Sequence, residues 1–373
     1  MIEKAAKEIS KLQGKKPYMF LLVFGIITAI LVPGIFNLVG NIEPSLEKVL
    51  PQNIEEVKTM NDMRSEFGAD MMYILVHPVE PIVDVRNPSY LNYIDLLEQK
   101  IIHHDAVLKT ESFAGEVKRI GGGVIPDSIS QIRTYETSKR FVNQDYSLSI
   151  IQIKSDTGAS AQKIKYVVDA IRADIASLEE VNPGAKIQLT GFNAIDKATF
   201  EVIVSDFGNI TIVSMALVMI VVFLVFRKLG RSMMPMAVVM TALLWTAGIA
   251  GYLNLTITVV SMVAAAMIMG LGIDFGIHVV HTYFEKRKTR QPKKALDDTL
   301  GELLRAMTGA SLTTMAGFLA LLFGVLPAMK TLSIILALGI FNVLIGAVFL
   351  LPVIVYVSDK DSDKSGLNKG KHL

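Results

Sequence analysis

Hydrophobic residues in this chain gather in six long blocks that are separated by polar connections. The blocks lie at residues 17–40, 209–226, 233–252, 256–283, 306–325 and 331–357. A helix needs about 20 mostly apolar residues to cross roughly 30 Å of hydrocarbon, and each block has about that length. The pattern therefore predicts a polytopic α-helical membrane protein with six transmembrane helices. One helix precedes and five follow a long polar segment at residues 41–205, with the five in residues 206–357.

The polar segment at residues 41–205 alternates between strand-like and helix-like stretches. Strands are predicted at residues 71–78, 105–113, 147–154 and 185–191, and helices at residues 88–104, 128–143 and 158–180. A last helix, residues 192–205, runs into the second membrane block. The third helix carries Ile164, Val168, Ile171 and Ile175 on one stripe. This order of elements predicts one α+β ferredoxin-like domain between the first and second membrane helices.

Basic residues predict how the chain is oriented in the membrane. They gather in the N-terminal segment 1–16, after the second block, after the fourth block and in the tail 358–373. By the positive-inside rule, these segments are cytoplasmic and residues 41–205 are extracytoplasmic, as in a multi-pass protein of the cell membrane. The first block is too long for a cleaved signal peptide and is expected to remain as a helix. An amphipathic helix is expected along the cytoplasmic surface at about residues 290–305.

Composition excludes several classes of function. The chain is 51% hydrophobic and has a net charge of +2, so no nucleic-acid partner is expected. It has no cysteine, which excludes disulfides, thiolate metal sites and cysteine nucleophiles. No catalytic motif is present, and His103 and His104 lack a third ligand at a recognisable spacing. No enzyme activity, metal site or cofactor is therefore predicted.

Asp274 is the one acidic residue deep inside any of the six blocks. A charged aspartate near the centre of a bilayer costs about 3 kcal/mol on insertion scales, so such a residue usually faces the interior of a bundle and serves an ion pathway. On a helical wheel, His278 and His281 lie within about 60° of Asp274, and Gly270 and Glu285 join the same face. This stripe of ionisable groups runs from the middle of the helix to its cytoplasmic end.

The stripe suggests a proton relay made of Asp274, His278 and His281. Desolvation favours the neutral form of a carboxyl group, which lets it bind and release protons near neutral pH, and histidine titrates in the same range. A protonated, hydrogen-bonded structural aspartate is the alternative. Metal binding by the three residues is geometrically possible but lacks a fourth ligand. An interfacial position explains His281 equally well.

Small residues are expected to hold this helix against its neighbours. Gly272 and Gly276 form a GxxxG pair on the face opposite the stripe, where another backbone can approach closely. In the fifth block, Ser311, Thr313 and Thr314 are candidates for hydrogen bonds across helices, with packing alone as the alternative.

The motif GLGIDFGIHVVHTYFEKR, residues 270–287, resembles the fourth helix of the resistance–nodulation–division (RND) superfamily. The match is best within its hydrophobe and amphiphile exporter branch, which contains MMPL-like, hopanoid-exporter-like and archaeal members. Residues 50–70, 189–206, 311–324 and 349–355 resemble other segments of that branch. The resemblance implies export of lipids or other hydrophobic molecules driven by the proton-motive force. It also implies a porter-like ectodomain and a proton relay at Asp274, beside an often aromatic position that Phe275 occupies here.

Most members of that superfamily contain two such halves, whereas this sequence shows one half and no internal repeat. The resemblance therefore implies a homodimer with the two fourth helices near its two-fold axis. Two alternatives share the six-helix half: an accessory subunit of protein export like SecD or SecF, and a non-transporting receptor like a sterol sensor. Metal efflux is a third.

Overall fold

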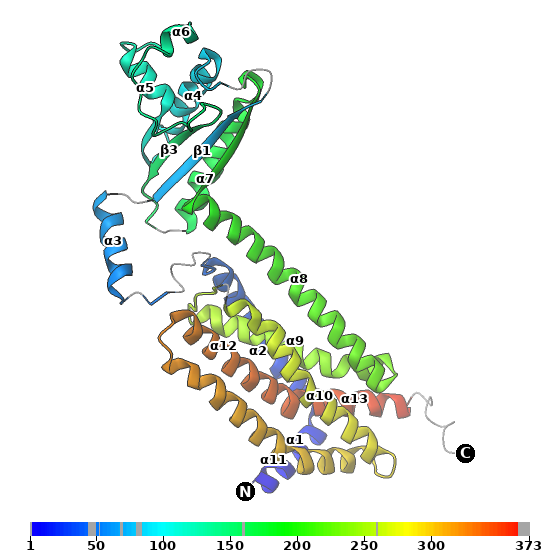
Figure 1. Ribbon diagram of the computed structural model, residues 1–373. Coiled ribbons are helices and arrows are strands. Elements are labelled where there is room, and N and C mark those ends of the chain that lie inside the picture. The colour runs from blue at the N-terminus through cyan, green and yellow to red at the C-terminus, as the bar shows by residue number, and fades with distance from the viewer. Residues whose placement is uncertain are drawn as a thin grey trace. The chain divides into compact units, whose positions relative to one another are not determined.

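A computed structural model of the chain describes residues 2–43, 50–51, 53–67, 70–79, 84–158, 161–258 and 260–364. The chain divides into two compact units. The helical unit comprises Met1–Glu43, Lys48–Leu50 and Val204–Leu373, and the sheet unit comprises Pro44–Glu47 and Pro51–Ile203 (Figure 1). Most of the predicted cytoplasmic tail, from residue 365 onward, lies outside the described residues.

Six helices among the described residues are long and apolar enough to cross a membrane, as predicted. Four of these spans are α2 (Pro17–Gly40), α8 (Phe192–Phe226), α9 (Leu229–Tyr252) and α10 (Ala264–Arg287), the last preceded by a 3-10 turn at Ser261–Val263. The fifth is α11 (Pro292–Leu319) with a 3-10 turn at Ala320–Phe323. The sixth is formed by α12 (Pro327–Ile345), a π-helical turn at Gly346–Leu350 and α13 (Leu351–Lys364). A helix, α1 (Ile2–Lys15), precedes them.

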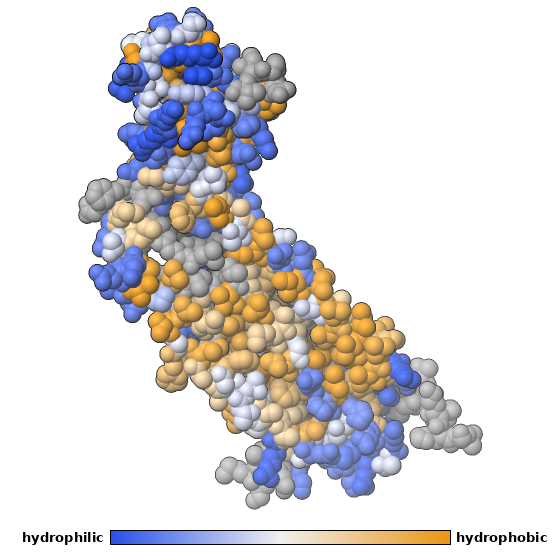
Figure 2. Space-filling model, in the orientation of Figure 1, coloured by the Kyte–Doolittle hydropathy of each residue, from blue (hydrophilic) through white to orange (hydrophobic). Residues whose placement is uncertain are grey.

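Helices α9, α10 and α12 form the buried centre of the helical unit, whereas few residues in the apolar stretches of α2, α8 and α11 are buried. The backbones of α2 and α9 approach closely, because a Cβ atom added to Gly34 would lie 2.3 Å from the carbonyl oxygen of Gly248. Nearby, the Trp245 ring stacks on Phe24, and its indole N–H donates to Thr28. The outer surface of the helices is largely hydrophobic (Figure 2), as a surface in contact with lipid must be.

Helix α1 is fixed to the last span by a buried glutamine. Gln13 is fully buried, and its Nε2 atom donates to the carbonyl oxygens of Val348 at 2.9 Å and Phe349 at 3.3 Å. Both acceptors belong to the π-helical turn, where the widened hydrogen-bond pattern leaves a carbonyl available. Beyond that turn, Asp359 accepts hydrogen bonds from Tyr283 Oη at 3.1 Å and Arg287 Nε at 2.6 Å.

The helix predicted at residues 290–305 is present, but it does not end before the fifth span. It is the first half of α11, which continues without a break into the fifth span. No Gly-Pro or Pro signal interrupts the sequence after Pro292, and the buried positions keep one stripe along the whole helix. That stripe contains Ala295, Leu296, Thr299, Leu300, Leu304, Met307 and Ser311.

The sheet unit has the ferredoxin-like topology that the order of elements predicted. Strands β1 (Asp70–Pro78), β2 (Val107–Ser112), β3 (Ser149–Ser155) and β4 (Ala185–Gly191) form one antiparallel sheet in the order β2-β3-β1-β4. Helix α4 (Pro88–Ile101) connects β1 to β2, and α7 (Ala161–Ser177) connects β3 to β4. The remaining helices are α3 (Glu55–Phe67), α5 (Phe113–Ile120) and the short α6 (Ile129–Ile132).

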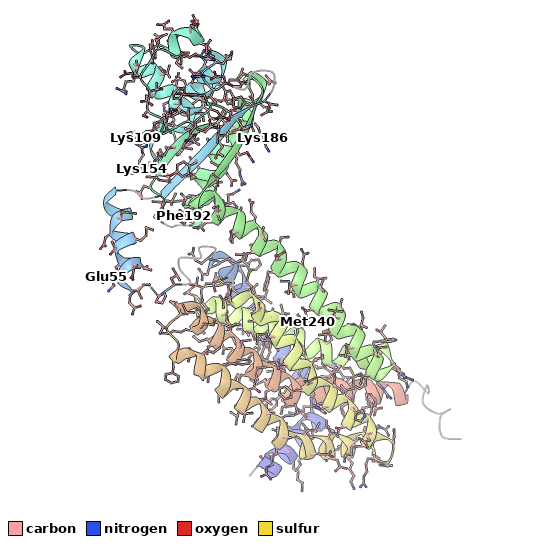
Figure 3. The ribbon with its side chains drawn as sticks, viewed as in Figure 1. Glu55, Lys109, Lys154, Lys186, Phe192 and Met240 are labelled. Carbon is pink, nitrogen blue, oxygen red and sulfur yellow. The ribbon has the colours of Figure 1, made fainter. Side chains whose placement is uncertain are left out.

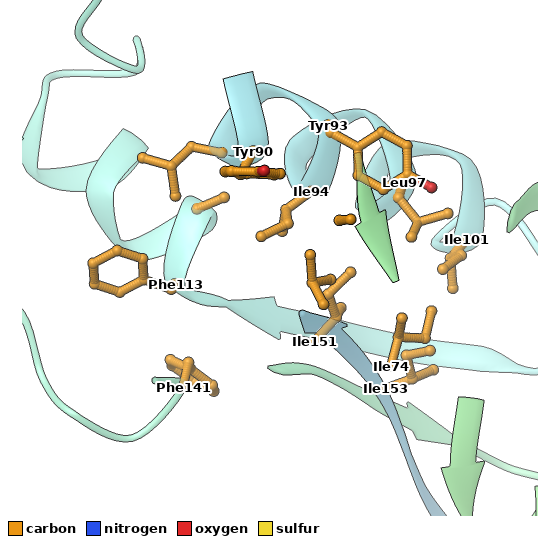
Figure 4. Close-up of a cluster of buried hydrophobic side chains, with 14 of the residues drawn as sticks. Ile74, Tyr90, Tyr93, Ile94, Leu97, Ile101, Phe113, Phe141, Ile151 and Ile153 are labelled. Carbon is orange, nitrogen blue, oxygen red and sulfur yellow. The ribbon is translucent and has the colours of Figure 1, made fainter. Parts of the chain in front are cut away.

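One face of the sheet forms the hydrophobic core of this unit (Figure 4). Ile74, Ile151 and Ile153 from the strands pack against Ile94 and Leu97 of α4, and all five are fully buried. The opposite face carries the lysines of neighbouring strands, Lys109, Lys154 and Lys186, which are marked in Figure 3. A sheet with one covered and one open face is typical of antiparallel α+β domains.

The helix predicted at residues 128–143 is wrong beyond its first turn. Helix α6 ends at Ile132, and Val142 forms an antiparallel bridge with Ser149 instead. Between them, the backbone N–H and the hydroxyl of Ser138 donate to the Glu116 carboxylate. Serine and threonine side chains that bond to other parts of the chain compete in this way with helix formation.

Candidate functional site

Helix α10 packs against its neighbours through its two glycines, as the GxxxG pattern predicted. A Cβ atom added to Gly272 would lie 2.8 Å from Cγ2 of Val343 on α12. One added to Gly276 would lie 2.7 Å from Cβ of Pro235 on α9. Both contacts are closer than real Cβ atoms approach, so only glycine allows α10 to lie this near to α9 and α12. These contacts determine which face of α10 is buried, and therefore also which face is exposed.

The opposite face of α10 carries the ionisable stripe, and this face is exposed. Asp274, His278 and His281 are all exposed in the single chain, and a Cβ atom added to Gly270 would meet nothing within 4 Å. Within the described residues, Asp274 and His278 form no hydrogen bond or ion pair. His281 Nδ1 lies 3.9 Å from the carboxylate of Glu285, one turn further along. The predicted residues therefore share one face, but their side chains do not contact one another.

The exposed residues of α10 follow a regular spacing. They include Met267, Leu271, Asp274, His278, His281 and Glu285. Successive members are four, three, four, three and four residues apart, which is the a/d spacing of a heptad repeat. Positions at this spacing form the contact line between two helices that cross at a small angle. These positions therefore form one continuous line along the exposed face of α10.

The other predicted supporting residues have different roles. Phe275 is half-buried and packs against two of the hydrophobic clusters of the helical unit. The hydroxyls of Thr313 and Thr314 both donate to the carbonyl oxygen of Ala310 at 2.9 Å, within their own helix. The predicted hydrogen bonds across helices are therefore absent for these two threonines in the described chain. Ser311 is fully buried, and its hydroxyl has no hydrogen-bond partner among the described residues.

Two acidic residues of the sheet unit, Glu98 and Asp84, have hydrogen-bond partners inside the chain, unlike Asp274. Burial raises the pKa of Glu98, whose carboxylate accepts a hydrogen bond from Ser112 Oγ at 2.5 Å. Burial alone would also raise the pKa of Asp84, but hydrogen bonds from Arg86 and Arg133 outweigh it and lower that pKa. Both carboxylates have partners that explain them as structural. Among the described residues, no group of three His, Asp or Glu side chains is placed to hold a metal ion.

Comparison with known proteins gives the family. Residues 48–364 match the family model described as MMPL family. The chain belongs to the MMPL family. A protein of Methanocaldococcus jannaschii, MJ1562, described as a membrane protein, is 28% identical to this MMPL-family chain and aligns with 96% of it and 95% of its own length.

Two further relatives are much longer than the part they share with this chain. The siderophore exporter MmpL5 of Mycobacterium tuberculosis is 25% identical over 58% of this chain and 23% of its own length. The membrane protein SCO5905 of Streptomyces coelicolor is 23% identical over 66% of this chain and 30% of its own length. This MMPL-family chain is accordingly a multi-pass membrane protein, as its six apolar helices indicate.

Sequence reasoning missed one buried polar pair in the centre of the helical unit. Asn342 on α12 donates to the hydroxyl of Thr246 on α9 at 3.0 Å, and both residues are almost fully buried. An isolated asparagine inside the apolar run FNVLIG was the available signal, because an amide in lipid requires a partner. The partner itself depends on how α9 and α12 pack, which no local pattern reveals.

Proposed function

We propose that this MMPL-family protein is an RND-type transporter that exports lipids or other hydrophobic molecules and is driven by the proton-motive force. One observation carries the proposal: an unpaired aspartate lies on the open face of α10, directly opposite the glycines that fix this helix. Family membership supports transport in general, and the described function of MmpL5 as an exporter supports the direction. The proposal includes no enzyme activity.

Asp274 supports proton coupling because its surroundings make its charge costly. A carboxylate facing hydrocarbon is penalised by about 3 kcal/mol or more, whereas its neutral form is tolerated far better. Binding and loss of a proton at Asp274 would therefore change how the α10 face interacts with its surroundings. A charge moving across the membrane gains about 2.3 kcal/mol per 100 mV, which is enough to shift a balance between two conformations. His278 and His281 would extend the relay toward the end of α10.

The exposed face of α10 further supports a homodimer. Two copies related by a two-fold axis along the membrane normal would place their α10 helices side by side and parallel. The heptad spacing would then bring Leu271 against Leu271 and Asp274 against Asp274 of the second copy. Each acid would leave the lipid, and the two would bind protons as one coupled pair. Thr313, which is exposed on α11, lies on a further surface that a second copy could cover.

The orientation that we propose places α1 and the polar end of α13, from residue 358 onward, in the cytoplasm and the sheet unit outside the cell membrane. The lysine-rich connections at one end of the helical unit support it, because cytoplasmic loops carry an excess of Lys and Arg. The sheet unit would then act as a porter domain that handles the hydrophobic substrate.

The test uses purified protein in liposomes that contain a pH-sensitive dye and a fluorescently labelled phospholipid. With a pH gradient imposed, the wild type is expected to move protons and to change the distribution of the labelled lipid. Asp274→Asn is expected to abolish both signals. Asp206→Asn is the matched control, because it removes an exposed acid on α8 at the start of the second apolar block.

The possible outcomes separate the competing functions. Proton movement that persists in Asp274→Asn contradicts the relay. A wild type that moves neither protons nor lipid under any gradient favours a receptor over a transporter. If Asp206→Asn loses activity to the same extent, the effect does not belong to the α10 stripe.

A further inference from the structure

A lysine-lined cavity of about 850 Å³ opens at one end of the helical unit. Its wall combines α1, the end of α10 and the first turns of α11. Five lysines line it: Lys7, Lys11, Lys286, Lys293 and Lys294. Figure 2 shows hydrophilic side chains gathered at this end of the helical unit. The proposed transport function assigns no role to this cavity.

Most of these lysines have no opposite charge to neutralise them. Lys286 pairs with Glu302 at 2.7 Å, but none of the ion pairs among the described residues includes Lys7, Lys11, Lys293 or Lys294. These four ammonium groups are exposed and surround one open space. Holding like charges around one space is unfavourable unless an anion enters it.

Two carboxylates also line the cavity, and neither removes the excess of positive charge. Asp298 faces Arg290 Nε at 3.7 Å. Asp297 has one carboxylate oxygen that is buried and has no hydrogen-bond partner among the described residues. Five lysines against these two acids leave an excess of three positive charges on the wall.

The end of a helix adds to this positive field. Helix α11 begins at Pro292, and its N-cap residue Gln291 makes no side-chain capping hydrogen bond. Backbone N–H groups in the first turn of a helix carry a partial positive charge and bind phosphate groups readily. Lys293 and Lys294 lie in that first turn, so the helix end and the lysines act on the same space.

The cavity has a fixed wall on the α1 side. Gln13 holds α1 to the π-helical turn of the last span through two hydrogen bonds. Gly14 lies against α11, since a Cβ atom added there would be 3.6 Å from Cγ of Lys293. Packing therefore holds together the two helices that carry lysines on opposite walls of the cavity.

The depth of the cavity in the membrane indicates its ligand. Helix α10 ends at Arg287, α11 begins at Pro292 and α2 begins at Pro17 directly after α1, so the cavity lies where the spans leave the hydrocarbon. Phospholipid phosphates lie at this depth. Leu12 and Leu22, which are 55% and 62% exposed, provide apolar surface on α1 and α2 for acyl chains.

We propose that this cavity binds the phosphate headgroup of an anionic phospholipid from the adjacent leaflet. The lysines would surround the phosphate, and the lipid would join α1 and α11 to the end of α10, the helix that carries the Asp274 stripe. A zwitterionic phospholipid carries a compensating cation and would gain less from the same wall.

The test is native mass spectrometry of the full-length protein in detergent, titrated separately with phosphatidylglycerol, phosphatidylcholine and glycerol 3-phosphate. Phosphatidylglycerol is expected to bind at least about tenfold more tightly than the other two, because each basic residue near an anionic lipid surface contributes favourably. Lys11→Gln combined with Lys294→Gln should weaken its binding by about tenfold or more. The control pair, Lys16→Gln with Lys288→Gln, removes the same charge from exposed positions outside the cavity and should change binding less than about twofold.

A second variant separates loss of binding from loss of folding. Asp297→Asn removes a negative charge from the wall and is expected to raise the affinity for phosphatidylglycerol by about threefold or more. A misfolded protein would not bind more tightly. The proposal is overturned if Asp297→Asn binds no better, if both lysine pairs lose affinity equally, or if glycerol 3-phosphate or phosphatidylcholine competes on equal terms. None of these outcomes depends on transport activity.

Discussion

Glu98 in the sheet unit and Asp274 in helix α10 are acids that lie among apolar residues, but they differ in burial and in hydrogen bonding. Glu98 is buried and accepts a short hydrogen bond from Ser112. Asp274 is exposed on α10 and forms no hydrogen bond or ion pair within the described residues. An acid that is satisfied within its own fold is explained by stability. An acid without a partner in its own fold needs one from outside the chain. For Asp274 we expect that partner to be a proton, a second copy of the chain or both.

The largest expected effect tests this contrast on activity. Asp274→Asn should reduce proton-coupled transport in liposomes by at least about 100-fold, because groups that transfer protons typically contribute that much. Glu98→Gln should leave transport within about twofold of the wild type, since the sheet unit keeps its packing. If the two variants were equally impaired, the distinction between the two acids would fail.

The next expected effect concerns the glycines that fix the orientation of Asp274. Gly276→Ala places a methyl group 2.7 Å from Pro235 Cβ and should destabilise the helical unit by about 1–3 kcal/mol through overpacking. Gly270→Ala is the matched control on the exposed face, where nothing lies within 4 Å. Thermal unfolding in detergent, followed by the fluorescence of the single tryptophan Trp245, measures both. Equal stability of the two variants would contradict the packed face.

A third prediction concerns the partner that Asp274 requires. The chain contains no cysteine, so single-cysteine variants report only on the position chosen. Leu271→Cys is expected to form a disulfide-linked dimer under mild oxidation in membranes, because this position repeats on the heptad line of α10. Leu217→Cys on α8, which is 59% exposed, is the control and should remain mostly monomeric. Cross-linking that is stronger at Leu217 would place the interface elsewhere.

A smaller effect is expected from the pH dependence of the sheet unit. Burial raises the pKa of Glu98 in the folded chain above its ordinary value of 4.5. The folded state therefore binds this proton more tightly than the unfolded state, so the contribution of Glu98 to stability is complete below pH 4.5 and is lost as the pH rises through the folded pKa. Glu98→Gln should remove this dependence. Hydrogen exchange of strands β1 and β3 at several pH values, corrected for intrinsic rates, measures it, and an unchanged profile would contradict the assignment.

The smallest effect is expected at the end of the stripe. His281 lies 3.9 Å from Glu285 and is exposed at the terminal turns of α10. His281→Gln should change the transport rate less than about threefold, whereas His278→Gln, one turn from Asp274, should change it more. The pH profile of transport distinguishes the two histidines. If His281→Gln slowed transport more than His278→Gln, the relay would depend mainly on the end of α10.

The six membrane helices and the sheet topology were predictable from sequence because each rests on a local pattern. Lipid requires long apolar blocks such as residues 17–40, and the alternation of strands and helices defines a ferredoxin-like order. The GxxxG pair was predictable for the same reason, since small residues at that spacing allow backbones to approach.

Features that depend on distant parts of the chain were not predictable. The partner of Gln13 lies more than 300 residues away, so no local pattern reveals this contact. Pro352, just after the π-helical turn, marks where the regular helix is interrupted, but it does not identify the group that bonds to the free carbonyl of Val348. The cavity at the end of α10 requires α1 and α11 to meet. The helix predicted at residues 128–143 was wrong because Ser138 donates hydrogen bonds to Glu116, and the spacing of hydrophobic residues does not reveal such a contact.

The π-helical turn at Gly346–Leu350 contains one residue more than an α-helical turn would need. If it converted to an ordinary α-helical turn, the part of the span beyond it would rotate by about 100° and shift by about 1.5 Å along its axis. Asp359 would then leave Tyr283 and Arg287, and Gln13 would lose its acceptors. The hydrogen bonds from Gln13 therefore favour the register of the last span that the structure shows, so the N-terminal helix stabilises the position of the last span.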